Sequence, residues 1–270
     1  MHPQIIYWDT GNGNILHKKE RMLVLCQAYP TISTKYEILI CLAGITVEGS
    51  LRRIYPVPFV NWQKDPVSKR SWIEYEMKDD RSSDGRKESR KIIPSTLSVH
   101  EEVSYEKLRE VILDNLSNLE DLNEQDSSLG IIKPTINDLD FEWKEARQKR
   151  SDIISKQSTL DGGRLNFYYP PELIKYRFAC NGSDECPGHH IMCEDWEAIL
   201  LYKKMMERGP TEEIAHQKVR KKLFDWMLEE RDLYFMMGTD ARFGKWLIIS
   251  LLYPRLPDPK SGRPLTLDDF

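Results

Sequence analysis

The sequence predicts an α+β fold, in which a small N-terminal β-barrel or sandwich is followed by a C-terminal α+β domain with a Cys/His metal-binding knuckle. Three observations lead to this prediction. Short apolar runs punctuated by Gly and Pro fill residues 20–95, as in small all-β domains. Helix-like and strand-like patterns follow one another after residue 100. Three of the five cysteines and two of the six histidines fall within residues 178–196.

The composition is that of an ordinary globular protein with one large or two small domains. The chain has 270 residues, of which 40% are hydrophobic and 30% are charged. No apolar run approaches the roughly 20 residues that a membrane span requires, and the first residues do not have the pattern of a secretory signal. Five cysteines, an odd and mostly clustered number, do not suggest a disulfide framework. We therefore expect a cytoplasmic protein with no membrane partner.

Charge is distributed unevenly along the chain. Residues 1–93 contain fifteen Lys/Arg and eleven Asp/Glu, whereas residues 94–135 contain three and nine. The net charge of −4 argues against a dedicated high-affinity DNA binder, although a local basic face remains compatible with it. We predict four regions: a basic β-barrel-like domain (1–95), an acidic helical connector (96–130), an α+β domain with the Cys/His cluster (131–255) and a tail (256–270).

Four strands are expected in the N-terminal domain, at residues 22–28, 36–47, 51–60 and 71–77. The last run alternates polar and apolar residues, as a half-buried strand does. The third contains Pro56 and Pro58, which cannot donate hydrogen bonds to a ladder. We therefore expect an edge strand or a bulge there.

Basic and aromatic residues gather at the ends of these strands. Interleaved cations and aromatic rings on a small barrel are typical of proteins that bind single-stranded nucleic acid, by phosphate pairing and base stacking. The alternative is a solvated loop surface with tryptophans that fill the barrel ends. The candidate nucleic-acid-binding residues are Arg52, Arg53, Lys69, Arg70, Trp72, Arg86 and Arg90.

The middle of the chain predicts a linker at 94–102 and then an amphipathic helix. Ser104 is the expected N-cap, and apolar residues recur at helical spacing up to Leu119. Residues 129–170 predict short strands or irregular chain.

Three carboxylates within that stretch, Asp138, Asp140 and Glu142, precede Lys144. They resemble the Asp and Glu-x-Lys pattern of metal-dependent nucleases, but seven residues are too few for two strands separated by a turn. We therefore expect a strand that points Leu139, Phe141 and Trp143 inward and carries the charges on its other face.

The strongest chemical signal is the pattern C-x5-C-x2-H-H-x2-C in residues 180–193. Zn²⁺ prefers four thiolate and imidazole ligands in a tetrahedron. The spacing is not one of the usual finger or ribbon spacings, and the alternative is a turn with buried thiols. We predict a structural zinc site formed by Cys180, Cys186, His189 and Cys193, with His190 as the alternative imidazole.

The C-terminal part predicts two helices and then a β-hairpin. The first helix begins after Cys193 with acidic residues and ends before Gly209, and the second is capped by Thr211 and runs to about residue 230. Residues 232–237 and 246–253 read as paired strands. Because the second of them is apolar throughout, we expect it to be central in its sheet.

These features favour a nucleic-acid- or nucleoprotein-binding accessory protein with a structural zinc site. One alternative is a metal-dependent nuclease or hydrolase, which would require an open metal position that three thiolates and one imidazole do not leave. Another is a non-catalytic subunit of a larger prokaryotic assembly.

Overall fold

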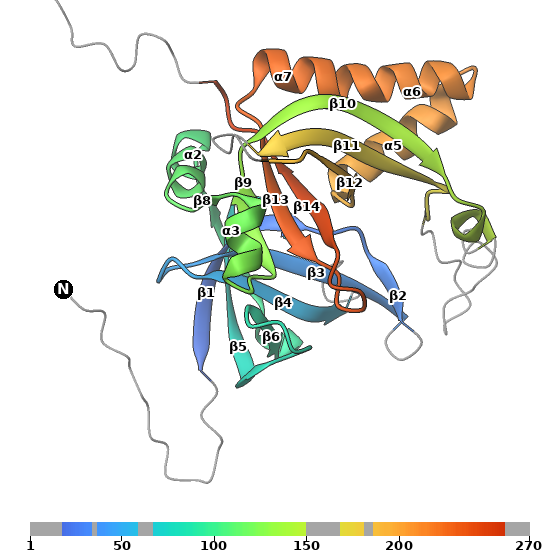
Figure 1. Ribbon diagram of the computed structural model, residues 1–270. Coiled ribbons are helices and arrows are strands. Elements are labelled where there is room, and N and C mark those ends of the chain that lie inside the picture. Colours follow the sequence, from blue (N-terminus) through green and yellow to red (C-terminus); the bar gives the residue numbers. More distant parts are fainter. Residues whose placement is uncertain (1–17, 34–36, 59–66, 150–167, 181–185, 257–270) are drawn as a thin grey trace, which may run out of the picture. The chain divides into compact units, whose positions relative to one another are not determined.

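The computed structural model forms two compact units, Met1–Glu102 and Val103–Phe270, each of which is described by itself (Figure 1). The described residues are 18–33, 37–58, 67–149, 168–180 and 186–256. Both units are built mostly from strands, with few helices, and the predicted α+β class is confirmed.

The first unit contains a closed five-stranded β-barrel. Within it β1 pairs with both β3 and β5, and β4 and β6 complete the circle as β3–β4–β6–β5. Strands β2 and β7 extend the sheet outside the circle, on β3 and β5 respectively. The strands are β1 (Lys19–Gln27), β2 (Thr31–Ser33), β3 (Glu37–Thr46), β4 (Leu51–Pro58), β5 (Ser71–Ser82), β6 (Ser89–Ile92) and β7 (Ser98–Glu102).

The barrel interior follows the sequence pattern. In β5, residues Ser71, Ile73, Tyr75 and Met77 are buried, and the residues between them are partly exposed, because side chains alternate between the two faces of a strand. All four predicted strands are present, although residues 36, 59 and 60 of the predicted ranges lie outside the described residues. The register between β3 and β4 shifts by one residue next to Pro56, so the expected bulge is confirmed.

The prediction of a linker at residues 94–102 is wrong for the second half of this segment, which forms a strand. Residues Pro94–Thr96 form a single 3₁₀ turn, η1, and β7 then pairs with β5. Strand β7 has the sequence SVHEE and no buried residue. A short, charged edge strand of this kind has no hydrophobic alternation, so its sequence gave no strand signal.

The second unit contains a seven-stranded sheet in the order β10-β11-β12-β14-β13-β9-β8. The predicted hairpin is β13 and β14, and β14 lies between β12 and β13, as expected for an apolar strand. The strands are β8 (Leu116–Ser117), β9 (Leu129–Ile132), β10 (Pro134–Trp143), β11 (Glu172–Cys180), β12 (His189–Cys193), β13 (Tyr234–Thr239) and β14 (Trp246–Leu252).

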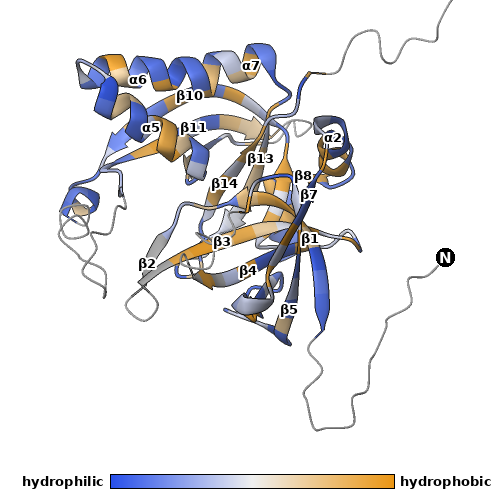
Figure 2. Ribbon diagram, turned by 180° about the vertical axis from the view of Figure 1, so that it is seen from behind, coloured by the Kyte–Doolittle hydropathy of each residue, from blue (hydrophilic) through white to orange (hydrophobic). Residues whose placement is uncertain are grey.

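Helices α5, α6 and α7 cover the face of the sheet formed by β10 and β11 (Figures 1 and 2). Asp195 and Thr211 cap α5 and α6 by accepting hydrogen bonds from the backbone N–H groups of Ala198 and Ile214. A π-helical turn, η2, joins α6 to α7. The helical elements of the unit are α2 (Tyr105–Leu113), α3 (Leu119–Glu124), α5 (Trp196–Arg208), α6 (Glu212–Arg220), η2 (Lys221–Asp225) and α7 (Trp226–Glu230).

The helix predicted from Ser104 to Leu119 is two helices. Ser104 caps α2 as expected, but α2 ends at Leu113 and Asn118 caps a new helix, α3. Asp114 and Asn115 follow the end of α2, and these residue types favour caps and turns because their side chains compete for backbone hydrogen bonds. The apolar spacing continued through this break, and for that reason the sequence predicted one helix.

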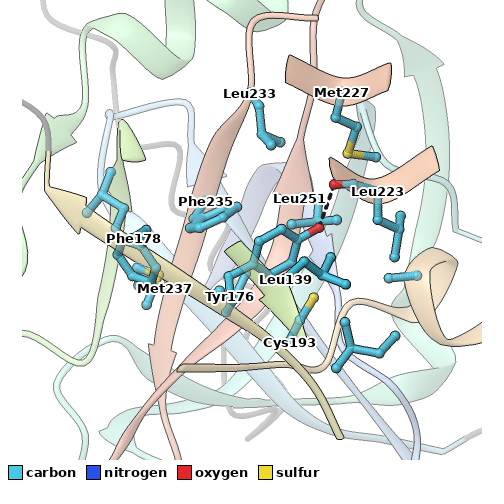
Figure 3. Packing of buried hydrophobic residues seen from close by; sticks show 14 of the residues in the cluster. Leu139, Tyr176, Phe178, Cys193, Leu223, Met227, Leu233, Phe235, Met237 and Leu251 are labelled. Carbon is cyan, nitrogen blue, oxygen red and sulfur yellow. Dashed lines mark hydrogen bonds between the residues drawn. The ribbon is translucent and has the colours of Figure 1, made fainter. Parts of the chain in front are cut away.

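The core of the second unit lies between the sheet and these helices (Figure 3). Tyr176 in β11 is fully buried and donates a hydrogen bond from its hydroxyl to the carbonyl oxygen of Leu223, at 2.9 Å. Phe178 and Phe235 meet edge to face with ring centroids 5.2 Å apart. Among the described helices, none is both long enough and apolar enough to cross a bilayer.

Candidate metal centre

The β11–β12 hairpin positions two of the predicted metal ligands. Cys180 is the last residue of β11 and His189 is the first residue of β12. His189 pairs with Phe178 across the hairpin, and Phe178 and Cys180 lie on the same face of β11. The imidazole and the Cys180 thiol therefore point to the same side of the sheet.

Cys186 approaches the same point from the loop that joins the strands. Its sulfur lies 3.2 Å from Nε2 of His189, and the sulfur of Cys180 lies 3.5 Å from that nitrogen. The backbone N–H of Cys180 donates to the Cys186 sulfur at 3.2 Å. Ligands about 2.0–2.3 Å from a tetrahedral zinc ion are separated by about 3.5 Å, so these atoms have the spacing of a zinc site.

The fourth group is Glu120, which is not among the ligands predicted from the sequence. Its Oε1 atom lies 3.7 Å from Nε2 of His189, and one ligand atom from each of the four residues falls within 4.8 Å of the others. Its second oxygen, Oε2, is buried and has no hydrogen-bond partner among the described residues. A buried oxygen without a partner is costly, so this atom is available to coordinate a cation.

Helix α3 carries Glu120 to the hairpin by packing closely on β9. Gly130 in β9 lies under Leu122 of α3, and a Cβ atom at Gly130 would be 2.1 Å from a Leu122 methyl carbon. The backbone N–H of Leu119 also hydrogen-bonds Cys180. No sequence pattern reveals this approach, because Glu120 lies sixty residues before Cys180 and only the sheet topology brings them together.

The four groups are electron-rich. Burial, helped by the nearby Cys186 sulfur and Glu120 carboxylate, raises the pKa of the Cys180 thiol to about 12, although the Leu119 N–H opposes this. In the described part of the chain no Lys or Arg side chain pairs with any of the four. A bound divalent cation would reverse this preference, because metal coordination requires the thiolate.

Cys193 does not join these ligands. It lies at the other end of β12, four residues beyond His189 and thus about 13 Å away along an extended strand. Its side chain is buried next to Tyr176 in the hydrophobic core (Figure 3). Residues 189–193 form a strand, and a strand separates ligands that a turn would bring together.

His190, the alternative imidazole, points to the opposite face of β12. Its Nε2 atom lies 3.0 Å from Oδ1 of Asp140. Asp140 also accepts from Arg177, while Asp138 pairs with Arg220. The carboxylates of β10 thus form ion pairs along the strand surface.

Three side chains of β10 were expected to point inward. Leu139 is buried and Phe141 packs against the core, as expected, but Trp143 is 54% exposed, so the expectation is wrong for Trp143.

Most of the candidate nucleic-acid-binding cations have partners within the barrel unit. Arg52 makes a two-pronged ion pair with Glu20, which also accepts from Tyr75. Arg53 is only 2% exposed and donates to the Ser89 hydroxyl at 3.1 Å. These two arginines therefore contribute to the packing of the unit.

The remaining candidates lie nearer the surface. Arg70 pairs with Glu102 at 2.7 Å, Arg86 with Asp84, and Arg90 with Asp80 at 3.7 Å. Lys69 is partly exposed. Trp72 is partly buried, with the Arg21 guanidinium 5.1 Å from its ring. Nucleic-acid binding by these residues stays a prediction.

Two family models match the chain. One, described as a domain of unknown function (DUF8758), covers residues 18–115, and the other, also described as a domain of unknown function (DUF8757), covers residues 110–266. No curated protein sequence matches the chain.

Proposed function

The chain belongs to the family of the domain of unknown function DUF8757, and we propose that its C-terminal unit binds one structural Zn²⁺ ion through Cys180, Cys186, His189 and Glu120. The observation that carries the proposal is the convergence of these four side chains, whose ligand atoms lie within 4.8 Å of one another.

Two features of the donor set favour zinc over other metals. Thiolate and imidazole ligands suit zinc, whereas calcium and magnesium prefer oxygen ligands. Both sulfur atoms also accept hydrogen bonds from the backbone. The N–H of Cys180 donates to the Cys186 sulfur, and the N–H of Leu119 donates to the Cys180 sulfur. Such hydrogen bonds favour the charged thiolate over the neutral thiol, which is the form that binds metal.

The ion would act as a brace. Four protein ligands fill a tetrahedron and leave no position for a substrate, as in structural zinc sites. They come from α3, the end of β11, the connecting loop and the start of β12, so the ion would fix α3 to the hairpin. This assigns it a role in folding and not in chemistry.

A zinc-braced unit joined to a basic β-barrel fits a recognition protein, and we infer a nucleic acid or a nucleoprotein as its partner. The supporting observations are the excess of cations in residues 1–93 and the partly exposed Lys69 and Trp72. The ion pairs of Arg52 and the burial of Arg53 reduce the number of cations available for phosphate.

Elemental analysis of the purified chain tests the zinc proposal. We expect about one structural zinc ion per chain, which Cys186→Ser removes together with thermal stability, because metallo-domains commonly unfold without their ion. Zinc that survives in Cys186→Ser at wild-type stoichiometry would contradict it. Binding of fluorescent oligonucleotides at two salt concentrations tests the partner class.

A further inference from the structure

A second group of potential ligands lies away from the cysteines, where α6 meets the start of β11. Glu212 and His216 are four residues apart on α6 and therefore share one face of the helix. Glu172, the first residue of β11, is only 6% exposed and faces them. One ligand atom from each of these three residues lies within 4.8 Å of the other two.

Neighbouring side chains hold these groups in place. Oε2 of Glu172 lies 2.6 Å from Nε2 of His216 and also accepts a hydrogen bond from the Tyr202 hydroxyl. Burial, and then the hydrogen bond to Glu172, raise the pKa of Tyr202, so that this hydroxyl remains a donor. Phe141 stacks on the His216 ring with centroids 4.2 Å apart and planes inclined by 7°.

The arrangement opens to a pocket of about 700 Å³. Its lining includes His216 and Glu212 from the ligand group, an apolar wall of Leu139 and Phe141, and polar residues Gln217 and Arg220. Arg220 is already engaged by Asp138 and by the Leu139 carbonyl oxygen. The pocket thus reaches Glu212 and His216, with Asp140 and Glu213 also in its lining, whereas Glu172 lies behind them.

Two carboxylates meet a single imidazole at this point. Among the described residues, neither Glu172 nor Glu212 pairs with a Lys or Arg side chain. A buried carboxylate is costly unless it is paired or bound to a metal. A hydrogen-bonded network of Glu172, Tyr202 and His216 alone would not need the additional negative charge of Glu212 beside it.

We propose that Glu172, Glu212 and His216 bind a divalent transition-metal ion and leave coordination positions open to the pocket. Imidazole and carboxylate ligands suit Zn²⁺, Co²⁺ and Mn²⁺. Three protein ligands with a free position are the arrangement of catalytic metal sites, in contrast to the closed set around Cys180. The open position takes an oxygen-donor ligand from the pocket.

Equilibrium dialysis of the full-length chain against zinc, followed by elemental analysis, tests the first half of the proposal. We expect two ions per chain, because the described residues include two such ligand groups. His216→Gln should remove one ion and Cys186→Ser the other, so the two sites fail separately. A second ion that persists in His216→Gln, or its absence from the wild type, would overturn the assignment.

Glu212→Gln keeps the test valid if His216→Gln does not fold, since Glu212 is exposed and its replacement leaves the core intact. We expect it to weaken the second ion's binding by about tenfold or more. The matched control is Glu229→Gln, which removes the same charge from an exposed position on α7 that does not line the pocket, and it should bind as the wild type does. Equal weakening in both variants would show a general charge effect and overturn the site.

Cobalt tests the open position. Co²⁺ added to the metal-free Cys186→Ser chain should give visible bands without a thiolate charge-transfer band, and acetohydroxamate should change those bands by taking the open position. Glu212→Gln in the same background should weaken this cobalt signal. A spectrum that acetohydroxamate leaves unchanged would overturn the open coordination.

Discussion

Cys193 and His189 lie on the same strand and on the same face of it, yet only His189 meets the other cysteines. His189 contacts the sulfur atoms of Cys180 and Cys186, whereas the Cys193 thiol packs in the core beside Tyr176. The position of a cysteine within the strand, and not its closeness in sequence, decides whether it is available to a metal.

This difference makes Cys193 a control for the metal site. We expect Cys193→Ala to keep its structural zinc, and to lose about 1 kcal/mol of stability or slightly more because a small cavity forms in the core. Cys186→Ser should lose the ion. Elemental analysis and thermal unfolding of both variants provide the measurement. If Cys193→Ala lost its zinc while circular dichroism showed that it is still folded, Cys193 would be a zinc ligand after all.

The second prediction concerns Glu120, a proposed zinc ligand that the Cys/His sequence pattern does not include. Replacement by Gln keeps the shape of the side chain but removes the charge, and we expect zinc affinity to fall by about tenfold or more. Glu124→Gln, one turn later on α3 and exposed, is the matched control and should bind zinc normally. Competition with a chromophoric chelator measures both. Unchanged affinity in Glu120→Gln would leave three protein ligands and an open position.

Most of the barrel and part of the metal site could be predicted from the sequence, for reasons that can be identified. Strand β5 alternates buried and exposed residues, so its pattern can be read directly. The cluster of Cys180, Cys186 and His189 is visible because hairpin ligands are close in sequence. Glu120 is not visible, since it reaches the hairpin only through the pairing of β9 within the sheet and the packing of α3 on Gly130.

The second ligand group shows the same limit. The spacing of Glu212 and His216 can be read from α6 once the helix is predicted, but two such residues on a helix surface are common. Glu172 supplies the buried carboxylate from forty residues earlier in the chain. Only the packing of α6 against β11 gives the pair a third member and a pocket.

The pH dependence of stability in the second unit should include a contribution from Asp232. Burial by itself would raise its pKa, but hydrogen bonds from Lys133, Tyr234 and Arg109 outweigh burial and hold the pKa below its usual value. A carboxyl group whose folded pKa is depressed stabilises the fold above its unfolded pKa, near 4 for Asp. That stability disappears as the pH falls from about 4 through the lower folded value.

Asp232→Asn should therefore remove about 2 kcal/mol at neutral pH and flatten the acid limb of the stability curve. Urea unfolding between about pH 3 and 7 measures the difference from the wild type. Glu230→Gln, at an exposed position two residues earlier, is the control and should leave the curve unchanged. An Asp232→Asn curve parallel to that of the wild type would mean that this carboxyl does not titrate with folding.

The last prediction concerns the barrel and its partner. If the first unit binds single-stranded nucleic acid, affinity for a fluorescent oligonucleotide should fall steeply as salt rises, because phosphate contacts release counterions. Trp72→Ala should lose about 1–3 kcal/mol of binding if a base stacks on its ring. Lys69→Ala should weaken binding and reduce the slope of log affinity against log salt concentration by about one.

Arg53 separates a binding role from a structural one. Since this side chain is 2% exposed and donates to Ser89, we expect Arg53→Ala to lower the stability of the barrel and not the affinity of the fraction that remains folded. Lys19→Ala, at an exposed position paired with Glu74, is the control for surface charge. Oligonucleotide binding that is absent at low salt, in a chain shown to be folded, would exclude nucleic acid as the partner and leave a protein partner for the barrel.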